Sequence, residues 1–91
     1  MQIRWTPNAT DDLERIAAYL KEHHPGYAES TVRELNANVQ SLQKFPRLGR
    51  LGREEGTREL VFGRLPYVAV YRVKDEAVEV LRIWHAAQNR L

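Results

Sequence analysis

The stretch PYVAVYRVKDEAVEVLRIWH, residues 66–85, decides the fold. It holds two runs rich in β-branched and aromatic residues, and only Lys74-Asp75-Glu76-Ala77 separates them. Such runs are typical of β-strands, and strands joined by so short a connection lie antiparallel beside each other. A third run, RELVF at 58–62, precedes them across Gly63-Arg64-Leu65-Pro66. We therefore expect a three-stranded antiparallel sheet in the C-terminal part of the chain.

A first helix is expected after Thr6-Pro7, because a hydroxyl residue suits the N-cap and proline suits the first helical position. We place Asp11 and Asp12 in or near its first turn, where carboxylates favour the positive end of the helix dipole. The apolar stripe of this helix comprises Leu13, Ile16, Ala17 and Leu20.

A second helix is expected from about Tyr27 to Phe45, after HHPG at 23–26 breaks the first and before Pro46. Its apolar face comprises Ala28, Val32, Leu35, Val39 and Leu42. Gln2 to Trp5 alternates and predicts a first strand. The expected fold is α+β with the order β-α-α-β-β-β: an N-terminal strand, an antiparallel two-helix hairpin and the three-stranded sheet. It forms a single domain over residues 1–91.

The composition of 43% hydrophobic and 29% charged residues is ordinary for a soluble protein. The chain has no cysteine, no apolar run of about 20 residues and no signal-peptide pattern at MQIRWTPNAT, so we expect a cytoplasmic protein that is not in a membrane. Residues 46–91 hold nine basic and six acidic side chains, and eight of the nine are arginine. A basic half of this kind attracts nucleic acid or an acidic protein.

No metal or cofactor is expected. Adjacent residues on a helix point about 100° apart, so His23 and His24 do not share an ion and instead favour the negative end of the helix dipole. The sequence contains no Gly-rich phosphate loop, no zinc spacing and no Ser-His-Asp pattern. PRLGRLGREEG at 46–56 reads as a surface loop, in which the arginines either balance Glu54-Glu55 or grip phosphates.

Arg58, Arg72 and Arg82 lie inside apolar strands, where a charge must reach a sheet edge, a partner or an acid. Regular alternation places one set on one face: Val68, Val70, Arg72, Val78, Val80, Arg82 and Trp84. It places another set on the opposite face: Tyr67, Ala69, Tyr71, Val73, Leu81, Ile83 and His85. The helices cover one face only, so we expect a protein partner across the second. A long loop or the N-terminal strand is the alternative cover.

The segments TPNATDDLERIAAYL, LQKFPRLGR and TRELVFGRLPYVAVYRVKDEAVEVLRIWHAAQNR together resemble the RelE/ParE superfamily of bacterial toxins over nearly the whole chain. The resemblance implies a toxin of a type II toxin–antitoxin module, of the kind that stabilises plasmids. A cognate antitoxin with a largely disordered segment would wrap and neutralise it in a hetero-oligomer. We expect the antitoxin to contact Tyr67, Val70, Arg72 and Trp84.

The superfamily divides by target. ParE-like members are described as poisons of DNA gyrase, whereas RelE-like members cleave mRNA in the ribosome. RelE-like chains commonly carry an arginine directly after the tyrosine that opens the middle strand, but here Val68 follows Tyr67. Because that arginine would offset phosphate charge, the resemblance favours a ParE-like inhibitor without a nuclease centre. The expected target-binding residues are Arg47, Arg50, Arg53, Gln88, Asn89 and Arg90.

The alternative is a ribosome-dependent mRNA interferase, similar to the YoeB members of the superfamily. It would be a metal-independent endoribonuclease with Arg58, Arg82 and His85 as catalytic residues. The ordinary pKa of histidine, about 6.5, suits proton transfer at neutral pH. Taken alone, a histidine at a strand end is more typical of a hydrogen-bonded structural residue, so His85 is open to both interpretations.

Overall fold

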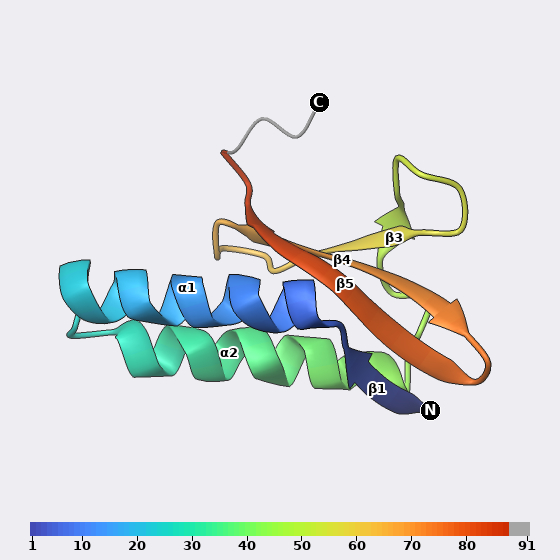
Figure 1. The fold of residues 1–91 in the computed structure, drawn as a ribbon, viewed down its shortest axis with the longest axis horizontal. Helices are drawn as coiled ribbons and strands as arrows, with labels where there is room; N and C mark the ends of the chain where they lie inside the picture. Colours follow the sequence, from blue (N-terminus) through green and yellow to red (C-terminus); the bar gives the residue numbers. More distant parts are fainter. Residues whose placement is uncertain (88–91) are drawn as a thin grey trace.

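Two helices lie side by side on one face of a five-stranded sheet (Figure 1). The computed structural model describes residues 1–87. Strand β1 (Gln2–Trp5) precedes helix α1 (Pro7–His23), helix α2 (Ala28–Gln40) and the short 3-10 helix η1 (Ser41–Gln43). The strands β2 (Arg50–Leu51), β3 (Arg58–Val61), β4 (Tyr67–Lys74) and β5 (Ala77–His85) follow. The α+β class and the order of the predicted elements are confirmed.

The sheet has two more strands than the predicted three, in the order β1-β5-β4-β3-β2. Strand β1 pairs in parallel with residues 77–80 of β5, so it extends the sheet and does not cover its second face. Strand β2 lies inside the predicted surface loop, where Arg50 pairs with Glu59 and Leu51 with Arg58. Periodicity within one segment records neither addition, because β1 pairs with the distant residues 77–80 and β2 is only two residues long.

Helix α1 begins as predicted. The Thr6 hydroxyl accepts the Ala9 N–H at 3.1 Å, and it donates to the carbonyl oxygen of Val80 at 3.0 Å. This N-cap therefore also ties the start of the helix to β5. Asp11 and Asp12 were expected in or near the first turn, and they lie just after it, because the helix begins at Pro7 and its first turn holds no acidic residue.

Helix α2 ends at Gln40, earlier than the predicted Phe45, because the chain tightens into η1. The Ser41 hydroxyl donates to the Asn38 carbonyl at 2.6 Å, and the Lys44 N–H donates to the Ser41 carbonyl. Such i to i+3 bonds are common where an α-helix ends.

A β-bulge in the β4–β5 pair sorts the side chains between the two faces. Val70 lies opposite Arg82 and Tyr71 lies opposite Val80, so Leu81 is the extra residue. The bulge reverses the alternation, and the prediction that Val78 and Val80 share a face with Val68 and Val70 was wrong.

The core lies between the helices and the inner face of the sheet. Tyr71, Leu35, Leu42 and Val39 are among its largest fully buried side chains. The buried sheet residues in this cluster are Leu60, Phe62, Tyr67, Ala69, Tyr71, Val78, Val80 and Ile83. They pack against Ala9, Leu35, Val39 and Leu42. The remaining face of β3, β4 and β5, which carries Val61, Val68, Val70, Arg72 and Trp84, is called the outer face below.

The β4–β5 hairpin turns through Asp75 and Glu76, whose φ angles are 53° and 59°. A two-residue turn with positive φ at both positions matches the right-handed twist of the strands, and it normally carries Asn-Gly or Asp-Gly. Glutamate has no such preference, so the left-handed conformation at Glu76 is strained.

Replacing Glu76 with glycine should therefore stabilise the protein. Glycine removes the steric cost at φ 59°, and we expect a gain of about 1 kcal/mol and a rise in Tm of roughly 4–8 °C. Thermal denaturation followed by circular dichroism measures it. Gly63, at φ 62°, supplies the matched control: Gly63→Ala should lower the Tm. If Glu76→Gly left the Tm unchanged, the strain argument would be wrong.

Candidate functional site

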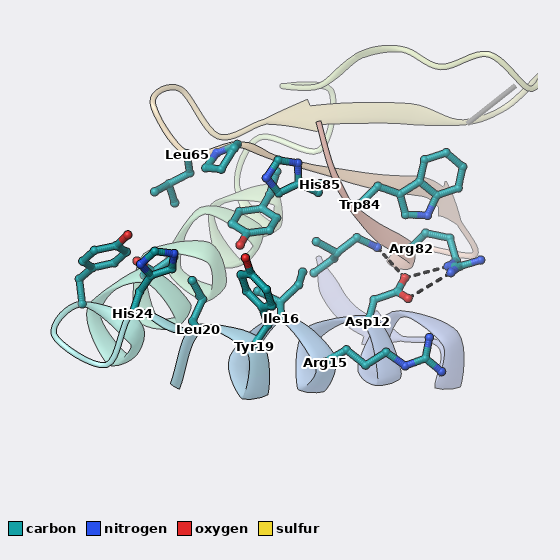
Figure 2. A pocket seen from close by; sticks show the side chains of 15 residues that line it. Asp12, Arg15, Ile16, Tyr19, Leu20, His24, Leu65, Arg82, Trp84 and His85 are labelled. Carbon is teal, nitrogen blue, oxygen red and sulfur yellow. Dashed lines mark hydrogen bonds and ion pairs between the residues drawn. The ribbon is translucent and has the colours of Figure 1, made fainter. Parts of the chain in front are cut away.

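A groove of about 740 Å³ lies between the helical hairpin and the end of β5. Figure 2 shows Tyr19 and His24 on the helical wall and Leu65 and His85 on the opposite wall. Six rings line the groove: Tyr19, His24, Tyr27, Tyr67, Trp84 and His85. Arg15 and Arg82 lie beside them, and Asp12, which also lines the groove, offsets the charge of Arg82. Aromatic walls next to arginines favour a ligand with apolar and anionic groups.

The rings of the groove are packed against each other. His24 stacks on Tyr27 with centroids 5.1 Å apart, and Tyr67 meets His85 edge to face at 5.4 Å. Burial raises the pKa of the Tyr67 hydroxyl, and the neighbouring Tyr19 and Tyr27 raise it further. His85 also accepts the Ala87 N–H at Nδ1, at 3.1 Å. His85 is thus a packed, hydrogen-bonded residue at the end of its strand.

Asp12 closes the open edge of β5. Strand β1 pairs with residues 77–80, and within residues 1–87 no strand lies beside residues 81–85 on that side. The Asp12 carboxylate accepts the Ile83 N–H at 2.9 Å and two bonds from the Arg82 guanidinium, at 2.7 and 3.1 Å (Figure 2). These bonds raise the pKa of Arg82. The carboxylate therefore satisfies a backbone N–H with which an edge strand of another chain could otherwise form a hydrogen bond.

Asp12 is a site residue that the sequence reasoning missed. Its side chain is only 9% exposed, and the sequence held a signal for this burial. Asp12 lies on the apolar stripe of α1, three residues after Ala9 and four before Ile16. A carboxylate on the buried side of a helix needs a partner, and strand arginines were the available cations. Arg82 and Arg72 do reach acids as expected, since Arg72 bonds Glu79 at 2.7 Å.

The three expected nuclease residues are not brought together. Arg82 and His85 line the groove, but Arg82 is bound to Asp12. Arg58 lies opposite Tyr71, whereas His85 lies opposite Tyr67. Those two tyrosines are four residues apart along β4, which is about 13 Å. Arg58 instead donates to the carbonyl oxygen of Gly49 at 2.8 Å.

The expected antitoxin contacts divide between the two faces of the sheet. Val70, Arg72 and Trp84 belong to the outer face, whereas Tyr67 is buried on the inner face and lines the groove. Trp84 lines the groove as well, so it joins the two surfaces. On the outer face Val61 is 47% exposed, whereas Val68 is 4% exposed, and both helices lie on the opposite face (Figure 1).

Tyr71 holds the start of the basic loop in place. Its side chain is fully buried, and its hydroxyl accepts the Gly49 N–H at 2.9 Å and donates to the Pro46 carbonyl at 2.7 Å. Arg47, Arg50 and Arg53 are exposed on the loop that follows. Gln88, Asn89 and Arg90, the other expected target-binding residues, lie outside the described residues.

In residues 1–87, no helix has both the length and the apolar character needed to cross a bilayer. Within the same range, no group of three or more His, Cys, Asp or Glu side chains is arranged to hold a metal ion.

Asp12→Ala should destabilise the protein by about 2 kcal/mol, because the Ile83 N–H is left without its acceptor. The bond to Arg82 adds little, since that side chain is 43% exposed. Urea denaturation measures the loss. Asp12→Asn should lose less than Asp12→Ala, because an amide oxygen still accepts the N–H. Glu29→Ala breaks an exposed ion pair with Arg33 and should change stability by under about 0.5 kcal/mol. An equally small effect of Asp12→Ala would contradict the role given to this carboxylate.

Tyr71 should make the protein sensitive to alkali. Burial raises its pKa above the ordinary tyrosine value of 10.0. The folded state therefore holds this proton more tightly than the unfolded state, so the stabilisation is complete below pH 10 and is lost as pH rises through the folded pKa. Tyr71→Phe should be less stable at neutral pH by about 1–3 kcal/mol, because Gly49 and Pro46 lose a hydrogen-bond partner. The free energy of unfolding of this variant should also fall less steeply as the pH rises above 10. Urea denaturation between pH 7 and 11 tests this, with the exposed Tyr19→Phe as the control.

The comparisons with known proteins agree with this fold. The family model described as ParE toxin of type II toxin-antitoxin system, parDE, matches residues 3–90. The protein Y4kP of Sinorhizobium fredii is 39% identical over 88 residues, which covers 97% of this chain and 91% of Y4kP. Toxin RelE2 of Caulobacter vibrioides is 38% identical over 87 residues, covering 96% of this chain and 97% of that one.

Among solved structures, the chromosomal ParDE toxin–antitoxin system from P. aeruginosa superposes with a TM-score of 0.86 at 31% identity, covering 93% of this chain and 95% of that one. The family model spans nearly the whole chain, and the relatives are matched over nearly their full length. The chain therefore belongs to the ParE toxin family of type II toxin–antitoxin systems, within the RelE/ParE superfamily.

Proposed function

We propose that this toxin arrests growth by binding DNA gyrase and not by cleaving mRNA. The observation that carries the proposal is that Arg58 and Arg82, the two arginines expected in a nuclease site, are already hydrogen-bonded within the protein. RNA cleavage without a metal needs an acid–base group and a phosphate-binding cation that reach the same phosphate. Arg58 is held by a loop carbonyl, far along the sheet from His85, and Arg82 is held by Asp12. The likeness to the ParDE system of P. aeruginosa supports the same choice.

A ribosome-dependent mRNA interferase is the second candidate. Arg82 and His85 line one groove, and the relative RelE2 bears the name of the other branch. In this reading the groove would receive a nucleotide, and His85 would protonate the leaving oxygen. Arg82 would first have to exchange Asp12 for a phosphate, because a guanidinium that is already bound twice to a carboxylate offers less charge to a substrate.

The proposed partner is a cognate antitoxin in the cytoplasm. Its segment would cross the end of β5, with one part on the outer face at Val70 and another in the groove beside Tyr67. Trp84 borders both surfaces, so a single extended peptide can contact them together. A disordered segment suits this course, because it can wrap around a strand end that a rigid domain would contact on one side only.

Two assays on the purified toxin test the target. Supercoiling by gyrase should be blocked, and mRNA in a translation mixture should remain intact. His85→Ala should leave gyrase inhibition unchanged, and cognate antitoxin should restore supercoiling. Val70→Ser should resist that neutralisation while it still inhibits gyrase, with Val73→Ser, which also replaces a partly exposed strand valine, as the matched control. Cleavage of mRNA that His85→Ala abolishes would overturn the gyrase proposal in favour of the interferase.

A further inference from the structure

Residues 45–53 read FPRLGRLGR, which consists of three consecutive triplets with a similar pattern. Each triplet begins with a large apolar residue, continues with proline or glycine, and ends with arginine. The triplets are Phe45-Pro46-Arg47, Leu48-Gly49-Arg50 and Leu51-Gly52-Arg53. This segment is called the triplet segment below. It contains β2 and lies at the edge of the sheet opposite to β1.

The middle residue of each triplet faces the protein. The Pro46 carbonyl accepts the Tyr71 hydroxyl. A Cβ at Gly49 would lie 2.8 Å from both the Glu59 carbonyl oxygen and the Tyr71 ring. A Cβ at Gly52 would collide with the side chain of Thr57. Close packing therefore explains why the second and third triplets carry glycine in the middle.

The first and last residues of each triplet face solvent. Phe45, Leu48 and Leu51 are 60%, 57% and 78% exposed. The three arginines are exposed as well. A soluble protein gains nothing in its own core from three large apolar side chains in this position, and apolar surface of this kind marks an interaction site.

The triplet segment is held in shape before any partner arrives. Tyr71 binds Pro46 and Gly49, and Arg58 donates to the Gly49 carbonyl. The Arg50 guanidinium bonds the buried Glu59 carboxylate at 2.9 Å. A surface that is already ordered loses little conformational entropy when it binds. These contacts give Tyr71 and Arg58 the role of positioning residues.

We propose that the triplet segment is the surface by which this toxin docks on its protein target, against an acidic patch that also offers apolar pockets. The inference rests on the proposed function, so the target is DNA gyrase. Residues 44–59 hold five basic and three acidic side chains, and Glu59 pairs with Arg50, so the exposed charge excess is positive and favours an acidic partner. The exposed leucines decide between partner classes, because a nucleic-acid backbone binds arginine but has no pocket for leucine.

The triplet segment is separate from the surfaces proposed for the antitoxin. Those surfaces are the groove and the outer face, which meet at Trp84 near the end of β5. The strand order places β5 and β2 three positions apart, which is about 14 Å. Variants on the triplet segment should therefore weaken target binding while antitoxin affinity stays the same.

The test compares paired variants for binding to purified gyrase, inhibition of supercoiling, and affinity for the antitoxin. Leu48→Ser/Leu51→Ser removes apolar surface, and Arg47→Gln/Arg53→Gln removes charge. Each should raise the Kd for gyrase at least tenfold without changing the antitoxin Kd or the Tm. Arg33→Gln/Arg64→Gln makes the same charge change at exposed arginines elsewhere, and it should keep the wild-type Kd for gyrase.

The outcomes separate this inference from the proposed function. If the wild-type toxin binds no gyrase, both are overturned. If the wild type binds and the leucine variant binds equally well, only the docking inference is wrong. If only the arginine variant loses gyrase binding, and a direct measurement shows that it has also lost affinity for duplex DNA, the segment binds nucleic acid instead. Loss of antitoxin affinity with normal gyrase binding would assign it to the antitoxin.

Discussion

The extra residue at Leu81 is the constraint on which the remaining structure depends. Without it, regular alternation would turn Val78 and Val80 away from the helices while Ile83 stayed with them. Burying a valine contributes about 1.5–3 kcal/mol, so a core without these two valines would be much weaker. The bulge therefore lets both halves of β5 contribute to one core, and it leaves Val68, Val70 and Trp84 together on the outer face.

The two edges of the sheet are protected by different means. At the end of β5, Asp12 occupies the Ile83 N–H, and Thr6 occupies the carbonyls of Val80 and Leu81. At the other edge, β2 is only two residues long. Short or capped edges resist pairing with other chains. Apolar side chains such as Val61 and Leu51 can thus be exposed without a long row of unpaired backbone groups beside them.

Local sequence predicted the features that depend on neighbouring residues. The Thr6 cap, the first helix, the β4–β5 hairpin and the α+β order all follow from residues within a few positions of one another. The parallel pairing of β1 depends on contacts between distant segments. The β2–β3 pair and the bulge depend on the register between neighbouring strands, which the hydrophobic periodicity of a single strand does not record. For the site, resemblance indicated the superfamily, but the engagement of Arg58 by Gly49 appears only in three dimensions. Asp12 was predictable in part, because its place on an apolar stripe was visible.

The parallel pairing of β1 with β5 joins segments that lie far apart in the sequence. Residues 2–5 pair with residues 77–80, which the ribosome adds much later. Closing that long loop has an entropic cost, and the favourable contacts of the paired strands must offset it. During synthesis β1 stays unpaired until β5 has been made, and until then the helices lack the sheet against which they pack. A chain interrupted before residue 77 lacks the partner strand of β1 and cannot form this core.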